Sequence, residues 1–324
     1  MNYSIRPLDP NVDFPRLVEL YNLVIPYPPT VENLQEQDAN PTEGRISQHL
    51  VAVDEHNQLI GSGNCLKEMW MPELRFAVDV NVFPEWRRQG VGTRLYEESV
   101  AFGKAKGCDF LIGMVREDQP DGVRFAQKHQ YIFARHFFGS HLTLSDFDET
   151  PFTAVLDKVK AGGIRFTTLA DMDGQDATVL RKLYDVYAAA VTDEPATAAV
   201  GNGVSDFGTF LKTYVEAAWY RPEGQIIALD GDRWVGLGSV GLLTESNTAY
   251  NFMTGVDRAY RGRGIAQALK LLGIRYARGQ QVDRIHTNND SSNEPMLAIN
   301  RKFGYQPEPG LFWIGRPVDL EGNG

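Results

Sequence analysis

The chain has 324 residues, of which 43% are hydrophobic and 23% charged, and its formal net charge is −10. This length favours two domains, and the apolar content excludes a largely disordered chain. The acidic balance disfavours nonspecific binding to nucleic acid. Two cysteines cannot build a disulfide framework, no signal-like leader is recognisable, and no apolar run could span a bilayer. We therefore expect a cytoplasmic protein with no membrane or nucleic-acid partner.

Hydrophobic periodicity predicts the elements of the first half in chain order. We expect a strand, two helices, three strands, an amphipathic helix, a buried strand, a short helix and closing strands, over residues 4–8, 15–25, 31–39, 48–53, 58–67, 73–83, 90–106, 108–115, 121–129 and 131–145. The second half is expected to repeat this order over residues 163–168, 176–191, 205–220, 225–229, 234–243, 248–256, 264–280, 284–287, 293–303 and 305–316.

A constant difference in residue number connects the two halves. Four pairs of landmarks share it: Arg87 and Arg261, Gly90 and Gly264, Asp109 and Asp283, and Tyr131 and Tyr305, each related by 261 − 87 = 174. Internal repetition at one spacing, with the same order of elements, indicates a duplicated domain. We expect domains at 1–150 and 160–324, joined by a linker at 146–163.

A loop rich in arginine and glycine lies between a predicted strand and a predicted helix in each half. Free N–H groups at a helix start, together with the helix dipole, attract an anion, and glycine lets a phosphate approach closely. Arg88, Arg261 and Arg263 can add charge-assisted hydrogen bonds. Each loop therefore predicts a pyrophosphate site. Neither loop contains a Walker or a complete Rossmann pattern.

The pattern Arg-x-x-Gly-x-Gly/Ala in this position resembles the acetyl-CoA signature of the GNAT superfamily of N-acetyltransferases. It occurs as Arg87-Arg88-Gln89-Gly90-Val91-Gly92 and again as Arg261-Gly262-Arg263-Gly264-Ile265-Ala266. The resemblance covers nearly the whole chain twice and is similar to the tandem type that includes mycothiol synthase-like proteins. It implies an α+β fold with a mixed sheet, formed as two tandem acyl-CoA N-acyltransferase domains.

The resemblance also implies which residues hold acetyl-CoA, the expected cofactor. The pyrophosphate would lie on the loops, and the pantetheine arm along the strand ends and two asparagines: Val82, Arg87, Arg88, Gln89, Gly90, Val91, Gly92, Thr93, Val256, Arg261, Gly262, Arg263, Gly264, Ile265, Ala266, Asn288 and Asn293. A backbone N–H at the strand end would polarise the thioester carbonyl. The scattered histidines lack zinc-site spacing, so no metal is expected.

The two halves are unequal in the features that the resemblance implies. Asn288, Asn293 and the pair Gly304-Tyr305 occur in the second half, whereas the first half has Met114 in place of Asn288. We therefore expect the second half to be catalytic. The first half is expected either to bind coenzyme A as well or to be a degenerate structural half.

The acid and the base are poorly defined. Many family members place a tyrosine acid four residues before the glycine of the Gly–aromatic pair, but this position is Asn300 here and Ala126 in the first half. Asp79 and Glu294 are the candidates for the base, and a solvated or ion-paired role is the competing interpretation for both. Candidate catalytic residues are thus Glu294, Asp79 and Asn300.

Two further patterns have competing interpretations. Glycines in the hairpin strands, at 61–63 and 236–241, either form the floor of a substrate channel or allow tight strand packing. Trp70, Trp219, Tyr220 and Phe252 either line a pocket or belong to the core.

The predicted function is transfer of acetyl from acetyl-CoA to a primary amine of a small molecule by direct attack, in a monomer or homodimer. Three alternatives stay open. They are a non-catalytic acetyl-CoA-binding or scaffold protein, an enzyme using another acyl-CoA, and a nucleotide-binding oxidoreductase, which the loop sequences oppose.

Overall fold

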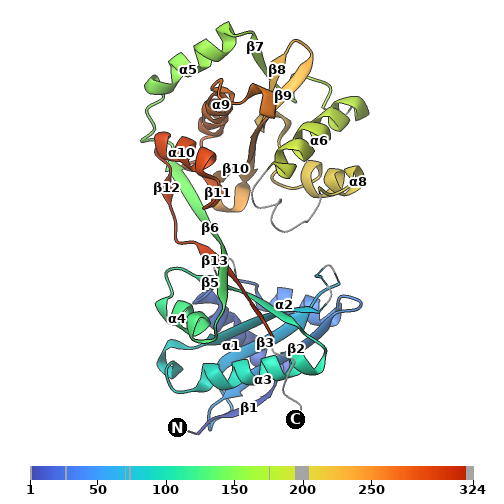
Figure 1. Ribbon diagram of the computed structural model, residues 1–324, viewed down its shortest axis with the longest axis vertical. Coiled ribbons are helices and arrows are strands. Elements are labelled where there is room, and N and C mark those ends of the chain that lie inside the picture. Colours follow the sequence, from blue (N-terminus) through green and yellow to red (C-terminus); the bar gives the residue numbers. More distant parts are fainter. Residues whose placement is uncertain are drawn as a thin grey trace. The chain divides into compact units, whose positions relative to one another are not determined.

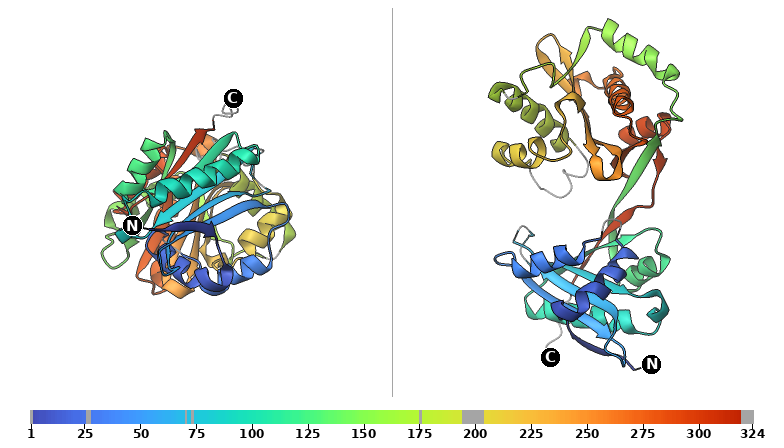
Figure 2. Two further views of the ribbon diagram at one scale, coloured as in Figure 1. Left: turned by 90° about the horizontal axis from the view of Figure 1, so that it is seen from below. Right: turned by 180° about the vertical axis from the view of Figure 1, so that it is seen from behind.

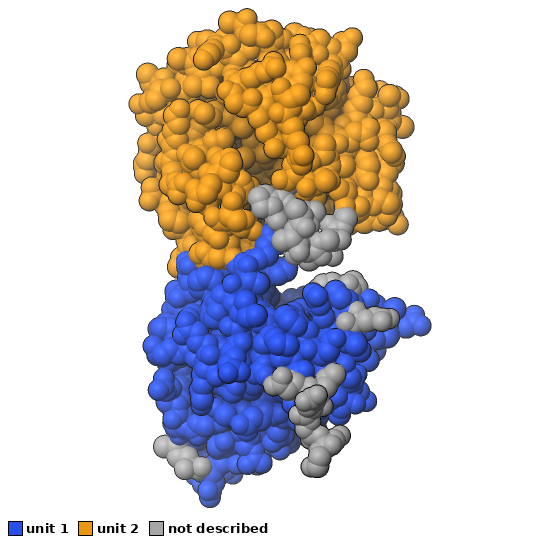
Figure 3. All heavy atoms as spheres, in the orientation of Figure 1, with its two compact units in different colours: residues 1–135, 311–324 blue, residues 136–310 orange. Residues whose placement is uncertain are grey.

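The computed structural model describes residues 2–318 except 26–27, 70, 73, 175 and 194–203, so Trp70 lies outside the described residues. The chain forms two compact units (Figures 1 and 3). Unit 1 contains Met1–Arg135 and Leu311–Gly324, and unit 2 contains His136–Gly310. None of the described helices is long and apolar enough to cross a membrane.

Unit 1 is a mixed sheet with helices on both faces. Its strands are β1 (Ser4–Pro7), β2 (Ile46–Val53), β3 (Leu59–Lys67), β4 (Arg75–Val82), β5 (Phe110–Arg116) and β13 (Leu311–Pro317). Its helices are α1 (Pro10–Asn22), α2 (Val31–Ala39), the 3-10 turn η1 (Pro84–Trp86), α3 (Val91–Ala105) and α4 (Pro120–Lys128). The sheet order is β1-β2-β3-β4-β5-β13, and β4–β5 is its parallel pair.

Strand alternation explains why helices cover both faces of this sheet. On β2, Val51 and Val53 pack in a cluster with Leu17 and Leu20 of α1, whereas Leu50 and Ala52 belong to a cluster with α3. Successive side chains of a strand point to opposite faces, so a continuous apolar run buries both. Figure 2 shows α1 (dark blue) and α3 (teal) on opposite sides of the blue strands.

Unit 2 has the same kind of sheet. Its strands are β6 (Ile132–Thr143, which begins in unit 1), β7 (Ile164–Thr168), β8 (Gln225–Asp230), β9 (Arg233–Leu243), β10 (Thr248–Val256), β11 (Arg284–Asp290) and β12 (Gln306–Pro307). Its helices are α5 (Thr150–Ala161), α6 (Ala177–Thr192), α8 (Phe207–Phe210), α9 (Ile265–Gly279) and α10 (Glu294–Lys302), with a π turn η2 (Leu211–Val215) and 3-10 turns η3 (Pro222–Gly224), η4 (Thr244–Ser246) and η5 (Arg258–Tyr260).

The order of strands in unit 2 is β6-β11-β10-β9-β8-β7, with β12 on β6 and β10–β11 as the parallel pair. Helix α9 packs on the β8–β10 strands, as α3 packs on β2–β4 in unit 1. The helix that we predict over 205–220 is replaced by α8, the π turn η2 and an irregular segment. Apart from α5 and the closing strands, the other elements follow the predicted order in both units.

The closing strands differ from the expectation. We expect 131–145 to complete the first half and 305–316 the second, but β5 of unit 1 pairs along its full length with β13, from the end of the chain. In unit 2, β11 pairs along its full length with residues 137–143 of β6. The structure therefore divides the chain at Arg135 and Leu311, which differs from the boundaries expected at 150 and 160.

The segment expected to be a linker is structured. Residues 150–161 form α5, and its Phe152, Leu156 and Val159 are buried in the core of unit 2. The ring of Phe152 stacks on that of Phe303, with centroids 4.0 Å apart. Apolar side chains at helical spacing thus make this segment part of a domain instead of a connection.

Candidate active site

The two arginine–glycine loops have the same internal structure. In unit 1, Nε of Arg87 donates to the carbonyl of Val82 over 2.9 Å, and in unit 2, Nε of Arg261 donates to that of Val256 over 3.1 Å. Two residues after Arg87, the side chain of Gln89 donates to the carbonyl of Glu85. At the corresponding place, Arg263 donates to the carbonyl of Ala259. The repeat that is visible in the sequence therefore extends to individual hydrogen bonds.

Both loops also share unusual backbone conformations. Gly90 and Gly264 have φ of 85° and 88°, and each is the N-cap of a helix of 15 residues. Two residues earlier, Arg88 and Gly262 are also left-handed, with φ of 62° and 77°. Positive φ explains the glycines, because side chains rarely tolerate it.

The N-termini of α3 and α9 fit a pyrophosphate. Neither glycine N-cap supplies a side chain to the first N–H groups of its helix, so these donors stay available to an anion. Three of the loop arginines also contact groups of the protein itself. Arg87 and Arg261 fasten the loops, Arg261 also pairs with Asp193, and Arg88 lies 3.5 Å from Asp121.

Each loop follows a strand that separates from its parallel neighbour. Pairing of β4 with β5 ends at Ala77 and Ile112, although both strands continue. Pairing of β10 with β11 ends at Tyr250 and His286. Beyond these points the two strands leave backbone groups unpaired along a gap, and such groups can bind an extended ligand arm.

Unit 2 alone has a bulge in the strand beside this gap. Strand β4 pairs with β3 over six consecutive residues, whereas on β10 the register against β9 shifts between Asn251 and Met253 and leaves Phe252 as an extra residue. The extra residue also changes the numbering difference between the two halves. At the start of the strand Thr248 corresponds to Arg75, a difference of 248 − 75 = 173. At its end Val256 corresponds to Val82, a difference of 256 − 82 = 174. A bulge frees a backbone N–H and re-aims its side chain.

Buried polar side chains hold the bulge in place. The amide of Asn251 donates to the carbonyl of Met253 over 2.8 Å, and the hydroxyl of Thr254 donates to Oδ1 of Asn251. The hydroxyl of Thr287, on β11, donates to the backbone carbonyl of Asn251. The amide of Asn251 also lies 3.4 Å from the carbonyl of Ser239 on β9, so polar contacts fix the bulge against both neighbouring strands.

Aromatic side chains pack around the bulge. Phe252 stacks on Trp219 with ring centroids 3.8 Å apart, and Tyr250 lies 4.6 Å from Phe252. A Cβ on Gly241 would lie 2.5 Å from the Trp219 ring, so this glycine serves tight packing. Phe252 and Trp219 remain partly exposed and can form a wall beside the gap, whereas Tyr220 is buried in the core.

The space between the two helices that flank the gap is filled differently in the two units. In unit 1 the ring of Tyr96 contacts those of Phe125, His129 and Tyr131, and Phe125 also contacts His129. In unit 2 the repeat keeps the last tyrosine, as Tyr305, but replaces the other three rings by Lys270, Ile299 and Phe303. The corresponding space in unit 2 is thus the one that contains a charged group.

The asparagines of unit 2 have different roles. Asn288 is exposed on β11, and Asn293 is the N-cap of α10, where its side chain accepts from the N–H of Met296. Asn300 is 3% exposed and donates to Asn289, which in turn donates to the hydroxyl of Ser140 over 2.9 Å. The sequence did not single out Asn289. The sequence feature that could have identified Asn289 is a polar side chain on the buried face of β11.

The candidate bases differ in their surroundings. Glu294 is largely exposed and pairs with Arg301 at 2.9 Å. Asp79 is also exposed, and its carboxylate accepts a hydrogen bond from the amide of Asn81 over 2.9 Å. Met253 occupies the matching position in unit 2. Among the described residues no cluster of His, Cys, Asp and Glu is arranged to hold a metal ion.

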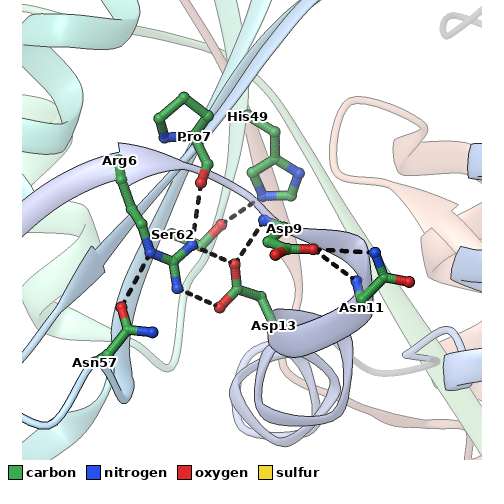
Figure 4. Close-up of polar contacts among 8 residues, drawn as sticks. All are labelled: Arg6, Pro7, Asp9, Asn11, Asp13, His49, Asn57 and Ser62. Carbon is green, nitrogen blue, oxygen red and sulfur yellow. Dashed lines mark hydrogen bonds and ion pairs between the residues drawn. The ribbon is translucent and has the colours of Figure 1, made fainter.

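A second polar cluster in unit 1 was not predicted (Figure 4). Asp13 is 2% exposed and accepts two hydrogen bonds from the guanidinium of Arg6, at 2.6 and 2.8 Å. Nearby, Nε2 of His49 lies 2.8 Å from the hydroxyl of Ser62, and burial lowers the pKa of His49 to about 4. The Asp13–Arg6 pair joins α1 to β1, so we assign it to stability.

These features define one mixed-sheet fold in two copies, each with a glycine-capped helix N-terminus beside a gap between two parallel strands, and a family comparison identifies it. The model of the acetyltransferase (GNAT) family matches residues 16–131 and 198–305. The chain belongs to this family and is a tandem GNAT acetyltransferase.

Relatives align along most of the chain. The chain is 25% identical over 277 residues to the mycothiol acetyltransferase of Thermobifida fusca, and the alignment covers 81% of each protein. A GCN5-related N-acetyltransferase from Sphaerobacter thermophilus has the same fold, with a TM-score of 0.65, 18% identity and coverage of 97% of this chain and 95% of its own. A tandem GNAT protein from the clavulanic acid biosynthesis pathway, described without AcCoA, aligns over 100% of both chains with a TM-score of 0.63 and 18% identity.

Proposed function

We propose that unit 2 transfers an acetyl group from acetyl-CoA to a primary amine of a small molecule. The observation that carries this proposal is the bulge at Phe252. It lies on the strand beside the gap, in the same unit as a helix N-terminus that fits a pyrophosphate. Unit 1 has the loop and the gap but no bulge.

Acetyl-CoA would supply an acyl group activated as a thioester. The N–H groups at the start of α9 would bind its pyrophosphate, and the unpaired edge of β10 beyond Tyr250 would bind its arm. A backbone N–H freed at the bulge would donate to the thioester carbonyl, where negative charge develops during attack. Such donors stabilise the transition state because they are already oriented.

The amine would approach from the side of Phe252 and Trp219. An aromatic wall binds apolar groups and also attracts an ammonium through its ring faces. The names of the relatives, a mycothiol acetyltransferase and a protein of the clavulanic acid pathway, favour a small molecule as the acceptor. Met253 replaces Asp79 in this unit, so we propose that water accepts the proton of the amine. Glu294, paired with Arg301, is the less favoured base.

Unit 1 is proposed to be non-catalytic. Its α3 N-terminus retains the anion site, but β4 has no bulge and four aromatic rings fill the space beside α3. A unit of this kind can bind coenzyme A without positioning the carbonyl for attack. The alternative of binding without turnover therefore applies to unit 1 alone.

A matched pair of loop variants tests the assignment. Gly262→Glu and Arg88→Glu place a carboxylate at corresponding positions, where Arg88 shows that the loop tolerates a side chain at positive φ. A Cβ at Gly262 meets no atom within 4 Å, whereas one at Gly264 would lie 3.1 Å from Val155. Position 262 therefore perturbs the anion site with little effect on packing.

The assay follows thiol release from acetyl-CoA with a panel of primary amines, and mass spectrometry identifies the acetylated product. We expect Gly262→Glu to abolish turnover and Arg88→Glu to retain it, with both variants folded by circular dichroism. Loss of turnover in Arg88→Glu alone would place catalysis in unit 1. Absence of amine-dependent release from the unmodified protein across the panel would overturn the proposed activity.

A further inference from the structure

Lys270 is a buried lysine on α9, and the proposed function does not yet use it. It is 3% exposed, and among the described residues its ammonium forms no hydrogen bond or ion pair. Its Nζ lies 4.6 Å from the centre of the Tyr305 ring. Burial without a counter-ion lowers the pKa of Lys270 to about 7. Burying a cation without a counter-ion costs free energy of folding. A lysine in such a place is therefore a candidate for interaction with a negatively charged ligand group.

The position of Lys270 along α9 brings it level with the bulge. Helix α9 starts where the loop after β10 ends, and it packs back along that strand. Lys270 lies six residues beyond the N-cap Gly264, which is about 9 Å along the helix axis. Met253, three residues before the end of β10, lies about 10 Å back along the strand. The same level of unit 2 therefore contains the lysine and the bulge.

None of the polar groups described around Lys270 forms a hydrogen bond or an ion pair with its ammonium. The hydroxyl of Tyr305 is buried and has no hydrogen-bond partner, and Oδ1 of Asn300 is in the same state. Lys302 of α10 donates to Gln267, and Glu149, before α5, pairs with Arg275. On β11, the hydroxyl of Thr287 and the amide of Asn289 are engaged with neighbouring strands. Asp290, at the end of β11, is buried and accepts hydrogen bonds from the N–H and the hydroxyl of Ser292. The other charged groups described on these elements are paired elsewhere or exposed.

We propose that Lys270 donates a proton to the thiolate of coenzyme A as it leaves, which takes the place of the missing tyrosine at Asn300. This inference rests on the proposed function of unit 2. The amine nitrogen forms a bond to the carbonyl carbon, the carbon–sulfur bond breaks, and its electron pair leaves on sulfur. The sulfur takes a proton from Nζ of Lys270, while the amine gives a proton to water. Water then protonates Lys270 again.

Unit 1 has a tyrosine at the position of Lys270. Tyr96 occupies the position of Lys270 in unit 1, and its hydroxyl is also buried without a partner. A protonated phenol carries no positive charge, whereas a protonated lysine does. Unit 1 therefore lacks the cation that would stabilise a thiolate. This difference agrees with the bulge in assigning the reaction to unit 2.

Coenzyme A itself is the probe for this role. A free thiol of this kind has a pKa of about 8.5, and a neighbouring ammonium lowers such a value. We expect the thiol bound to unit 2 to ionise about tenfold more readily than free coenzyme A, by the ultraviolet absorbance of the thiolate in a pH titration. The shift should vanish in Lys270→Met and in Lys270→Tyr, the residue that unit 1 carries. It should persist in the matched variant Tyr96→Phe.

Kinetics provide a second readout. Lys270→Met should lower kcat about a hundredfold with little change in the KM for acetyl-CoA, and it should remove the decline of kcat at high pH. Wild-type kcat and thiol ionisation in a folded Lys270→Met variant would overturn the role of Lys270 and leave the proposed function intact. Failure of the unmodified protein to bind coenzyme A or to turn over any amine would instead remove the proposed function.

Discussion

The buried charge of Lys270 predicts an unusual dependence of stability on pH. The pKa of this lysine falls from 10.5 to about 7 on folding, a difference that corresponds to up to about 5 kcal/mol. Between these two values the unfolded chain holds a proton that the folded protein has lost. The free energy of unfolding should therefore rise with pH in this window, because the unfolded state binds more protons. Below pH 7 the full cost of burying the cation remains.

Replacement by methionine removes this dependence. Lys270→Met should be more stable than the unmodified protein at pH 7, and the difference should shrink by about 2 kcal/mol by pH 9. Guanidinium denaturation at the two pH values measures it. Lys302→Met is the control, since Lys302 is exposed and its loss should shift stability equally at both pH values. A constant difference between Lys270→Met and the unmodified protein would refute the reasoning that the lysine is buried without a counter-ion.

Three further substitutions test other parts of the structure. Gly241→Ala would place a Cβ 2.5 Å from Trp219, and overpacking of this kind should cost about 1–3 kcal/mol in thermal denaturation; an unchanged Tm would contradict the packing described. Asp13→Asn leaves Arg6 without its charged partner, and it should lower the free energy of unfolding of unit 1 by about 3–5 kcal/mol in urea denaturation. A cost below about 1 kcal/mol would show that the pair contributes little to stability. Asn251→Val gives β10 the valine of the corresponding unit 1 position and removes the side chain that bonds across the bulge. We expect kcat to fall about tenfold or more while acetyl-CoA still binds in calorimetry. An unchanged kcat would mean that the Asn251 side chain does not hold the bulge.

The sequence was sufficient to predict the loops and the family. The two halves stay in one register there because no residue is inserted between each loop and the end of the following helix pair. Local rules were enough: glycine at positive φ, an arginine close to the strand end, and an apolar stripe on α3 and α9. These signals depend on neighbours in the sequence, which is why they could be recognised without the structure.

Longer-range features could not be predicted in the same way. The partner of a closing strand depends on which sheet edge it meets, and residues 131–145 and 305–316 carry no local mark of that choice. The bulge was missed because the register of the repeat was measured beyond Phe252. The extra residue becomes visible only when the paired starts of the strands, Arg75 and Thr248, are known from the structure. Lys270 was missed because a lysine in an amphipathic helix is usually exposed, although it stands between the buried Leu269 and Leu271.

Deletion of Phe252 tests whether catalysis takes place at the bulge of unit 2. It gives β10 the bulge-free register that β4 already has against β3, so the fold of unit 1 shows that such a strand is compatible with this sheet. The measurement is kcat for amine-dependent thiol release, with acetyl-CoA binding followed by calorimetry on the same variant. Binding should persist, and kcat should fall by about a hundredfold or more. Undiminished kcat in the deletion variant would contradict catalysis at the bulge of unit 2.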